Sequence, residues 1–250
     1  MHSCFNLTHH HASNDLWLIC PGSLGPAYLL SKLIPPNASQ LWLDYSLHDK
    51  VSYGDVIDEL VHTITDYAKS YIIHCLGYSL GGRLLFSAMP LVQVSVASVT
   101  FISAGLPLTS PGDTKQKHQF ELSAIEQLTT LSSAEFIEWW HQLPIYHLLD
   151  QHSGFKDYCE QLSQSLNKPQ LQHILSKLSV RHMPQTTFKS TTPATYIYGE
   201  NDMKYRTIAQ NFHQYFHHLD IVSIPNTSHL CWFEQPQIIQ RALQLITNRL

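Results

Sequence analysis

The feature that most constrains the fold is the stretch IHCLGYSLGGRLL, residues 73–85. It contains the pattern G-x-S-x-G, in which Ser79 stands between Gly77 and Gly81. An apolar run typical of a buried strand precedes the pattern, and a run that predicts a helix follows it. A serine on such a strand–turn–helix elbow is held in a strained conformation, and glycines on both sides let neighbouring backbone come close. The backbone N–H of Leu80, at the helix N-terminus, can then stabilise an oxyanion.

Strands and helices alternate along most of the chain. Short apolar runs bounded by turn residues predict strands at residues 16–20, 40–45, 71–77, 97–103, 194–199 and 219–224. Apolar positions at helical spacing predict helices at residues 27–34, 52–69, 80–89, 207–216 and 236–250. The stretch SCFNL near the start suggests an additional edge strand. This alternation predicts an α/β protein with a mostly parallel sheet and helices on both faces.

Residues 108–190 interrupt the alternation, since they contain helical patterns and no clear strand. The predicted helices lie at residues 120–130, 134–142, 155–166 and 169–180. Ser133 and Asn167 are expected to cap two of them. Loops that leave the carboxyl ends of parallel strands form the ligand sites of α/β proteins, so we expect this insertion to be a lid. The predicted organisation is a first core part (1–107), a helical lid (108–190) and a second core part (191–250).

The composition excludes several classes of protein. Of 250 residues, 44% are hydrophobic and 14% are charged, which supports a folded core. The formal net charge is −4 and no basic stripe occurs, so nucleic acid is not an expected partner. No run is apolar for the ~20 residues that a membrane span needs. The N-terminus also lacks the pattern of a signal peptide. We therefore expect a cytoplasmic monomer or homodimer.

The cysteines and histidines do not indicate a metal site. The five cysteines are scattered and form no C-x-x-C pair, so neither zinc nor a disulfide framework is expected. Among the 17 histidines, the run His9–His11 is poorly arranged to bind one ion, because consecutive strand residues point to opposite faces. The sequence contains no H-E-x-x-H pattern. We expect neither a metal nor another cofactor.

A serine is a weak nucleophile near neutral pH unless a base and an orienting acid activate it. In proteins with this elbow the chain order is serine, acid, histidine. His229 lies in the loop PNTSHLCWFEQP between the last strand and the last helix, whereas His217 and His218 precede that strand. The acid should follow the preceding strand, where YGENDMKY offers Glu200 and Asp202. We prefer Asp202 because it lies deeper in the turn.

Two further positions extend the candidate site. The loop CPGSLGP follows the first core strand, and there Gly22 permits a close turn and the backbone N–H of Ser23 is a candidate oxyanion donor. Arg83 lies four residues after Ser79, about one helical turn further along the same face. Its guanidinium can hold a substrate carboxylate bidentately, or it can be a structural arginine paired inside the core. Both interpretations remain open at this point.

Three stretches carry a family resemblance. GYSLGGR (77–83), FIEWWHQLPIY (136–146) and YGENDMKYRTIA (198–209) resemble the elbow, the lid segment and the acid-bearing turn of one enzyme family. That family is 2-succinyl-6-hydroxy-2,4-cyclohexadiene-1-carboxylate synthase, a lyase of menaquinone biosynthesis in the α/β-hydrolase superfamily. The similarity runs in the same order over most of the chain. It implies an α/β-hydrolase fold with a helical lid.

The resemblance also implies an activity. In that family the serine, acid and histidine abstract a proton and drive the elimination of pyruvate, and no acyl-enzyme is required. Tyr78, Arg83 and Trp140 match motif positions that line the pocket. The substrate of the family carries several carboxylates, which would give Arg83 a function. A small carboxylated or acyl molecule is therefore the expected partner.

The sequence departs from the family where charge is concerned. The family brings further arginines from its lid, but here no arginine lies between Arg83 and Arg181. Lys115, Lys117 or His118 could substitute, although lysine is not a bidentate fork. The turns DYSLHDK (44–50) and SAGLPL (103–108) also differ from the family pattern.

Two other functions share the same residues. A serine hydrolase, either a carboxylesterase or an acyl thioesterase, would use Ser79 as the nucleophile and His229 to activate water. Elbow, triad and oxyanion hole serve the lyase and the hydrolase alike, so the pocket must discriminate between them. Scarce positive charge in the lid favours the hydrolase, and motif similarity favours the lyase. A ligand-binding protein without activity is the third alternative, which the complete triad makes improbable.

Overall fold

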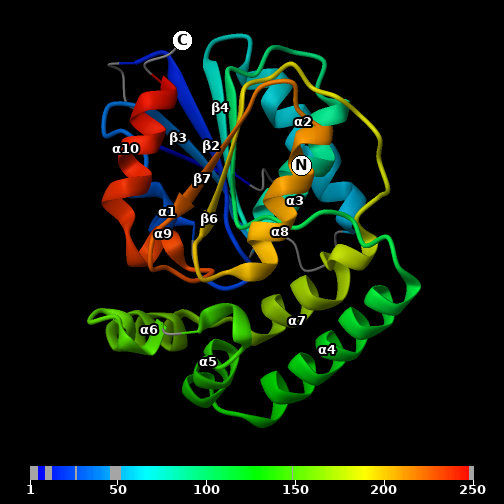
Figure 1. The fold of residues 1–250 in the computed structure, drawn as a ribbon, viewed down its shortest axis with the longest axis vertical. Helices are drawn as coiled ribbons and strands as arrows, with labels where there is room; N and C mark the ends of the chain where they lie inside the picture. Colours follow the sequence, from blue (N-terminus) through cyan, green and yellow to red (C-terminus); the bar gives the residue numbers. More distant parts are fainter. Residues whose placement is uncertain (1–4, 9–12, 26, 46–51, 148, 248–250) are drawn as a thin grey trace.

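The predicted strands assemble into one seven-stranded sheet in the computed structural model, which describes residues 5–8, 13–25, 27–45, 52–147 and 149–247. Its order is β1-β3-β2-β4-β5-β6-β7 (Figure 1). The strands are Phe5–Thr8 (β1), Asp15–Cys20 (β2), Ser39–Leu43 (β3), Ile72–Tyr78 (β4), Ser98–Ile102 (β5), Ala194–Gly199 (β6) and Leu219–Ile224 (β7). From β3 to β7 neighbouring strands pair in parallel, whereas β1 pairs antiparallel with β3. The predicted mostly parallel sheet and its edge strand are confirmed.

The apolar runs of the central strands reflect helices on both faces of the sheet. All of β5 is buried, as is β4 after its first residue. One face carries α2 (Tyr53–Tyr67), α3 (Leu80–Ala88) and α8 (Met203–Asn211), and the other carries α1 (Tyr28–Ser31), α9 (Cys231–Glu234) and α10 (Pro236–Thr247) (Figure 1). Sequence dictates the helix ends locally: Ser52 and Asp55 form a capping box at the start of α2. Parallel strands with helices on both faces form a three-layered α/β/α fold.

Four helices lie together beyond the carboxyl ends of the strands, between β5 and β6 in the chain (Figure 1). They are α4 (Pro111–Thr130), α5 (Ser133–His141), α6 (Phe155–Ser165) and α7 (Lys168–Lys177). Short 3₁₀ turns join them, including Pro144–Tyr146. These helices, here called the helical segment, stand over the edge of the sheet where α/β proteins form their ligand sites.

Three helix starts differ from the prediction. The first helix of the segment begins at Pro111 rather than near residue 120, because Ser110 caps it and proline fits the first turn. Ser132, and not Ser133, caps α5. The helix predicted from residue 207 begins at Met203, since Asp202 serves as its cap. Asn167 caps α7 as predicted. Each error arose where a polar cap and not an apolar residue marks the first turn.

Some features of the sequence fall outside this description. The histidine run at residues 9–11 and most of the turn at residues 44–50 are not among the described residues. Within the described ranges, no group of three or more histidine, cysteine, aspartate or glutamate side chains is placed to hold a metal ion. No described helix is both long enough and apolar enough to cross a membrane.

Candidate active site

Ser79 stands on a sharp turn between β4 and α3, as the G-x-S-x-G pattern predicts. Its backbone has φ 49° and ψ −105°, a conformation that side-chain-bearing residues rarely adopt. A Cβ atom on Gly81 would lie 2.0 Å from the carbonyl oxygen of Cys20, and one on Gly77 would lie 2.6 Å from Cα of Gly82. Close backbone packing therefore explains both glycines that flank the serine.

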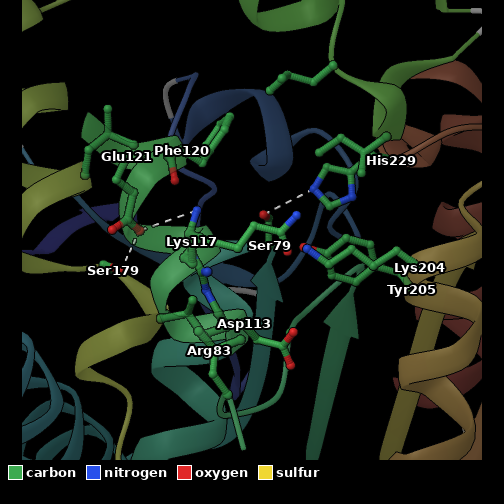
Figure 2. A pocket seen from close by; sticks show the side chains of 18 of the residues that line it. Ser79, Arg83, Asp113, Lys117, Phe120, Glu121, Ser179, Lys204, Tyr205 and His229 are labelled. Atoms are coloured by element: carbon green, nitrogen blue, oxygen red, sulfur yellow. Dashed lines mark hydrogen bonds and ion pairs between the residues drawn. The ribbon is translucent and has the colours of Figure 1, made fainter. Parts of the chain in front are cut away.

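Tertiary structure brings His229 and Asp202 to the serine. His229 Nε2 lies 3.2 Å from Ser79 Oγ (Figure 2), and His229 Nδ1 lies 2.9 Å from Asp202 Oδ2. Because an ionised carboxylate only accepts hydrogen bonds, Nδ1 of the neutral ring carries the proton. Nε2 is then free to accept the proton of the serine hydroxyl. The three side chains form a continuous serine–histidine–aspartate chain of hydrogen bonds.

The acid is selected by the contact between two loops. The loops after β6 and β7 are joined by a hydrogen bond of 2.9 Å from the N–H of Asn201 to the carbonyl of Thr227. This contact places Asp202, which is buried, beside the histidine. Glu200 points elsewhere: its carboxylate accepts the backbone N–H of Asn226 at 3.0 Å on the surface. Glu200 thus stabilises the neighbouring turn, and Asp202 contacts the histidine.

The surroundings of His229 keep its imidazole neutral. Burial is the main cause that lowers its pKa, and the positive charges of Lys204 and Arg83 lower it further against the opposing effect of Asp202. A neutral imidazole can act as a general base near pH 7. Its backbone is also fixed, because the N–H of His229 donates to the carbonyl of Ile145 in the helical segment at 3.0 Å.

Two backbone N–H groups flank the serine where an oxyanion would form. Leu80 is the first residue of α3, and Ser23 in the loop after β2 lines the same cavity as Ser79. In the part of the chain that is described, neither N–H has a hydrogen-bond partner. Gly22 must be glycine, because a Cβ there would lie 2.7 Å from the Tyr78 ring. Free donors held on rigid backbone can stabilise developing negative charge.

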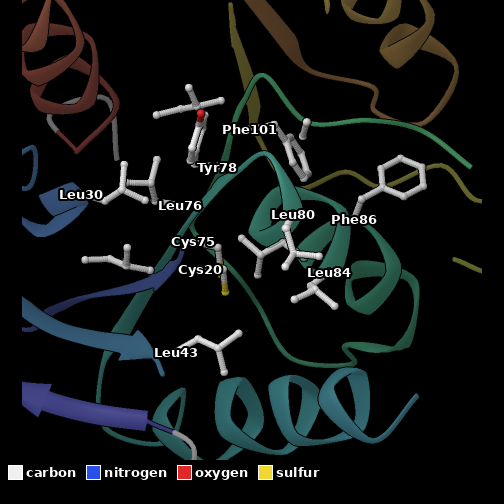
Figure 3. Packing of buried hydrophobic residues seen from close by; sticks show 14 of the residues in the cluster. Cys20, Leu30, Leu43, Cys75, Leu76, Tyr78, Leu80, Leu84, Phe86 and Phe101 are labelled. Carbon is white, nitrogen blue, oxygen red and sulfur yellow. The ribbon is translucent and has the colours of Figure 1, made fainter. Parts of the chain in front are cut away.

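The elbow rests on a closely packed core (Figure 3). Leu80 and Leu84 of α3 lie beside Cys20 of β2 and Cys75 of β4, and all four side chains are fully buried. Interiors packed to this density yield little to small displacements. The sheet and α3 therefore hold the serine in its strained position.

A cavity of about 620 Å³ opens in front of Ser79 and His229. Its walls come from the carboxyl edge of the sheet and from the helical segment. Three cationic side chains line it, Arg83 from α3, Lys117 from α4 and Lys204 from α8, together with the carboxylates of Asp113 and Glu121 from α4 (Figure 2). The cavity thus combines the hydrogen-bonded triad with cations that outnumber the carboxylates, which suits an anionic ligand.

The two aromatic residues predicted to bind substrate occupy different places. Trp140 lines the main cavity. Tyr78 does not; its ring lies 5.3 Å from the His229 ring and 5.6 Å from the Trp232 ring, and it borders a smaller recess beside Ser79. Tyr78 therefore packs against His229, and a direct contact with substrate stays a prediction.

The cations of the cavity are unequally paired. Arg83 Nε is buried and has no hydrogen-bond partner among the described residues. Lys117 Nζ lies 3.4 Å from Glu121 Oε1, and burial together with the charge of Arg83 lowers the pKa of Lys117 to about 8. Glu121 also accepts the hydroxyl of Ser179 and, at 2.6 Å, Nε of Arg181. Arg181 therefore neutralises the buried glutamate, whereas Arg83 stays available to a ligand.

Sequence reasoning found only part of this charge. Of the three candidates to replace lid arginines, Lys117 lines the cavity, whereas Lys115 and His118 are exposed. Lys204 was missed, although it follows Asp202 by two residues and lies in the first turn of the helix that Asp202 caps. Glu121 was also missed, because the helical pattern around it does not show which face turns toward the sheet.

Fold and site together define an α/β-hydrolase-fold protein. Over 181 residues the chain is 22% identical to a Bacillus subtilis (strain 168) protein that carries the provisional name 2-succinyl-6-hydroxy-2,4-cyclohexadiene-1-carboxylate synthase. The match covers 70% of this chain and 65% of that protein, which is just under two thirds of the relative's length. This similarity confirms the predicted resemblance. No family model matches the chain.

Solved structures support the fold. MenH from S. aureus superposes with a TM-score of 0.83 at 13% sequence identity, covering 98% of each chain. A thermophilic esterase from Thermogutta terrifontis superposes with a TM-score of 0.71 at 15% identity, covering 98% of this chain and 92% of the other. An epoxide hydrolase, Cif from Acinetobacter nosocomialis, gives 0.73 at 9% identity, covering 97% and 84%. The α/β-hydrolase fold is therefore shared with proteins of several activities.

Proposed function

We propose that the protein is a lyase like 2-succinyl-6-hydroxy-2,4-cyclohexadiene-1-carboxylate synthase, which eliminates pyruvate from a carboxylated substrate in menaquinone biosynthesis. The observation that carries this proposal is that one cavity contains both the hydrogen-bonded serine–histidine pair and a group of cations. Ser79 and His229 lie at the same cavity wall as the cations Arg83, Lys117 and Lys204. A neutral ester would not need three cations, whereas a substrate with several carboxylates would.

The proposed reaction is a base-driven elimination. His229 Nε2 takes the proton of Ser79, and the serine oxygen takes a proton from a substrate carbon. The electron pair of that C–H bond forms a new double bond as the C–O bond to the pyruvate group breaks. Pyruvate leaves as its enolate, and the one proton taken from the substrate, now held on His229, returns to the enolate carbon to give the keto acid and the neutral imidazole. Asp202 stabilises the imidazolium that exists between these steps.

The proposed substrate contacts follow from side-chain chemistry. Arg83 offers a planar fork that can bind one carboxylate in a bidentate way, and Lys117 and Lys204 act as point charges for others. Lys117 comes from the helical segment, so the segment contributes positive charge despite its lack of arginine there. Trp140 supplies an apolar wall beside the ring of the substrate. The N–H groups of Ser23 and Leu80 would bind the oxygen that gains negative charge.

A serine hydrolase is the second candidate, and the free oxyanion donors favour it. An acyl-enzyme on Ser79 would place its carbonyl oxygen between the N–H groups of Ser23 and Leu80. His229 would then activate water for deacylation. The likeness in fold to an esterase is compatible with this alternative but carries no argument for substrate.

The organisation and setting of the chain belong to the same proposal. Residues 108–190 would act as a lid over a core made of residues 1–107 and 191–250, with the cavity between them. We propose a cytoplasmic monomer or homodimer that works on a small molecule without a cofactor. Sedimentation of the purified protein would measure the oligomeric state directly.

The deciding experiment is a direct assay of purified protein with the enolpyruvyl intermediate of the pathway, following pyruvate release, beside a neutral p-nitrophenyl ester. We expect pyruvate release that Ser79→Ala abolishes and weak or no ester cleavage. Arg83→Lys should raise KM for the carboxylated substrate and leave ester kinetics unchanged. Efficient ester cleavage without pyruvate release would establish the hydrolase instead. An equal effect of Arg83→Lys on both substrates would mark the arginine as structural.

A further inference from the structure

A second, smaller recess of about 30 Å³ opens beside Ser79. None of the three cations of the main cavity lines it. Its wall consists of Ser23, Leu24, Tyr78, Ser79, Trp140, His141, Tyr146, Tyr158 and Leu230. The volume suits one water molecule and no larger group. Ser23 and Ser79 border both this recess and the main cavity, so the recess lies next to the position proposed for the oxyanion.

His141 presents a hydrogen-bond acceptor in this recess. Its Nδ1 lies 2.8 Å from the carbonyl oxygen of Ile137, and a carbonyl only accepts, so Nδ1 carries the proton. In the neutral ring Nε2 is then an acceptor. Burial lowers the pKa of His141 to about 4, so the ring is neutral at physiological pH. The residue is 9% exposed, and within the described residues Nε2 has no partner.

Tyr158 brings a second polar atom without a partner to the same wall. The residue is 4% exposed, and its hydroxyl has no hydrogen-bond partner in the described part of the chain. Two other polar groups at the recess are paired with each other, since Nε1 of Trp140 donates to the Tyr146 hydroxyl at 3.0 Å. Buried polar atoms nearly always have a partner in protein or in ordered water. Both residues line one water-sized recess, and neither of these two atoms is fully enclosed by protein. A single water molecule in the recess can therefore donate to Nε2 of His141 and accept the hydroxyl of Tyr158.

We propose that this recess is a binding site for one water molecule, held by His141 and Tyr158, that donates a hydrogen bond to the oxyanion beside Ser79. The water would donate one O–H to Nε2 of His141 and accept the hydroxyl of Tyr158. Its second O–H then points at the position where negative charge develops. The catalytic part of this inference rests on the proposed function, whereas the water site itself does not.

The water would act as a third donor beside the N–H groups of Ser23 and Leu80. A bridging water gives a hydrogen bond nearly as favourable in enthalpy as that of a direct donor, but holding the water in place costs entropy. Removing one oxyanion donor typically lowers kcat by about 10²–10³-fold, and a donor held through water should contribute less, about tenfold. His141 and Tyr158 would then be positioning residues, since they act through the water and touch no reacting atom.

The first test is a crystal structure of the unliganded wild-type protein at a resolution that shows ordered water. We expect one peak within hydrogen-bond distance of both His141 Nε2 and the Tyr158 hydroxyl. Tyr158→Phe keeps the ring and removes only the hydroxyl, and it should lose the peak or leave it weak. An empty recess in the wild-type protein, or one filled by a side chain, would overturn the proposal whatever reaction the enzyme performs.

The second test measures kcat and KM separately in the reaction that depends on Ser79. Tyr158→Phe and His141→Phe should each lower kcat about tenfold. For Tyr158→Phe, KM and the melting temperature should stay nearly unchanged. Tyr67→Phe, on α2 away from the site, is the matched control and should leave kcat unchanged. A wild-type kcat in Tyr158→Phe would refute the catalytic role even if the water is seen. Absence of pyruvate release by the wild-type protein would reject the lyase and leave the water site standing.

Discussion

Lys117 is held in the folded protein at an energetic cost that can be measured. Its side chain is 28% exposed and shares the cavity with Arg83 and Lys204, and its Nζ lies 3.4 Å from Glu121 Oε1. These surroundings lower its pKa from the ordinary value of 10.5 to about 8, with burial as the largest cause and the Arg83 charge next. One pKa unit corresponds to about 1.4 kcal/mol, so the charged form is disfavoured by roughly 3 kcal/mol in the absence of ligand.

Replacing Lys117 by methionine should therefore stabilise the protein and weaken its binding of anions. Methionine keeps the length and apolar contacts of the side chain but carries no charge, and Glu121 retains its bond from Arg181. Part of this stabilisation is offset because the variant loses the contact between Lys117 and Glu121. We expect a gain of about 1–3 kcal/mol in the free energy of unfolding at pH 7. The same change should raise KM for a carboxylated substrate.

The pH dependence of this gain has a defined sign. The folded pKa lies below the unfolded one, so between about 8 and 10.5 the unfolded chain binds more protons at residue 117. The destabilisation by Lys117 is fully present below pH 8 and disappears as the pH rises toward 10.5. The stability difference between Lys117→Met and wild type should thus be largest at pH 7 and small near pH 10.

Urea unfolding of both proteins at pH 7 and pH 10 provides the assay. Lys115→Met is the matched control, because Lys115 is exposed on the same helix and should leave stability unchanged at both pH values. A Lys117→Met variant that is less stable than wild type at pH 7, or whose difference does not depend on pH, would refute the reasoning. Burial and the charge of Arg83 would then not disfavour the charged form of Lys117.

Three further predictions concern the triad and the elbow. Asp202→Asn should lower kcat on the order of 10⁴-fold, whereas Glu200→Gln should leave kcat nearly unchanged. Steady-state kinetics of the two variants measure this, and a larger loss in Glu200→Gln would show that the wrong acid was chosen. Ser79→Gly should be inactive yet more stable by about 1 kcal/mol in thermal unfolding, because glycine adopts φ 49° without strain; a lower melting temperature would contradict this. Gly81→Ala should destabilise the protein by about 4 kcal/mol or more, since the added Cβ would lie 2.0 Å from the carbonyl oxygen of Cys20. A loss below about 1 kcal/mol in the free energy of unfolding, measured in urea, would disprove that packing.

The fold could be predicted from local patterns. Apolar runs of strand length and apolar residues at helical spacing depend on burial, which acts on each element separately. All six predicted core strands are present, and the errors lie in the helices: starts such as Pro111 and Met203, the early ends of α1 at Ser31 and of α8 at Asn211, and the unpredicted α9. A helix start is marked by a polar capping residue, and many other serine, threonine, aspartate and asparagine residues in the sequence cap no helix.

The order of the site residues could be predicted as well. A parallel sheet brings the loops after β4, β6 and β7 to one edge, so Ser79, Asp202 and His229 can meet once the strands are placed. The preference for Asp202 over Glu200 rested on its depth in the turn, and the contact between the two loops places Asp202 beside His229. The hydrogen bond from His229 to Ile145 had no signal in either stretch, because it joins the base to the helical segment.

The sequence by itself determined the strained serine, its glycines and the mostly parallel sheet, because these follow from sterics and burial within a few residues of chain. Only the tertiary structure decided which charges face the serine. Arg83, Lys117 and Lys204 come from three helices that are far apart in the chain, and the buried pairing of Glu121 with Arg181 depends on how α4 packs against the residues after α7. Helical periodicity indicates that a face is buried but not what it is buried against, so the charge of a cavity becomes visible only when the elements are assembled.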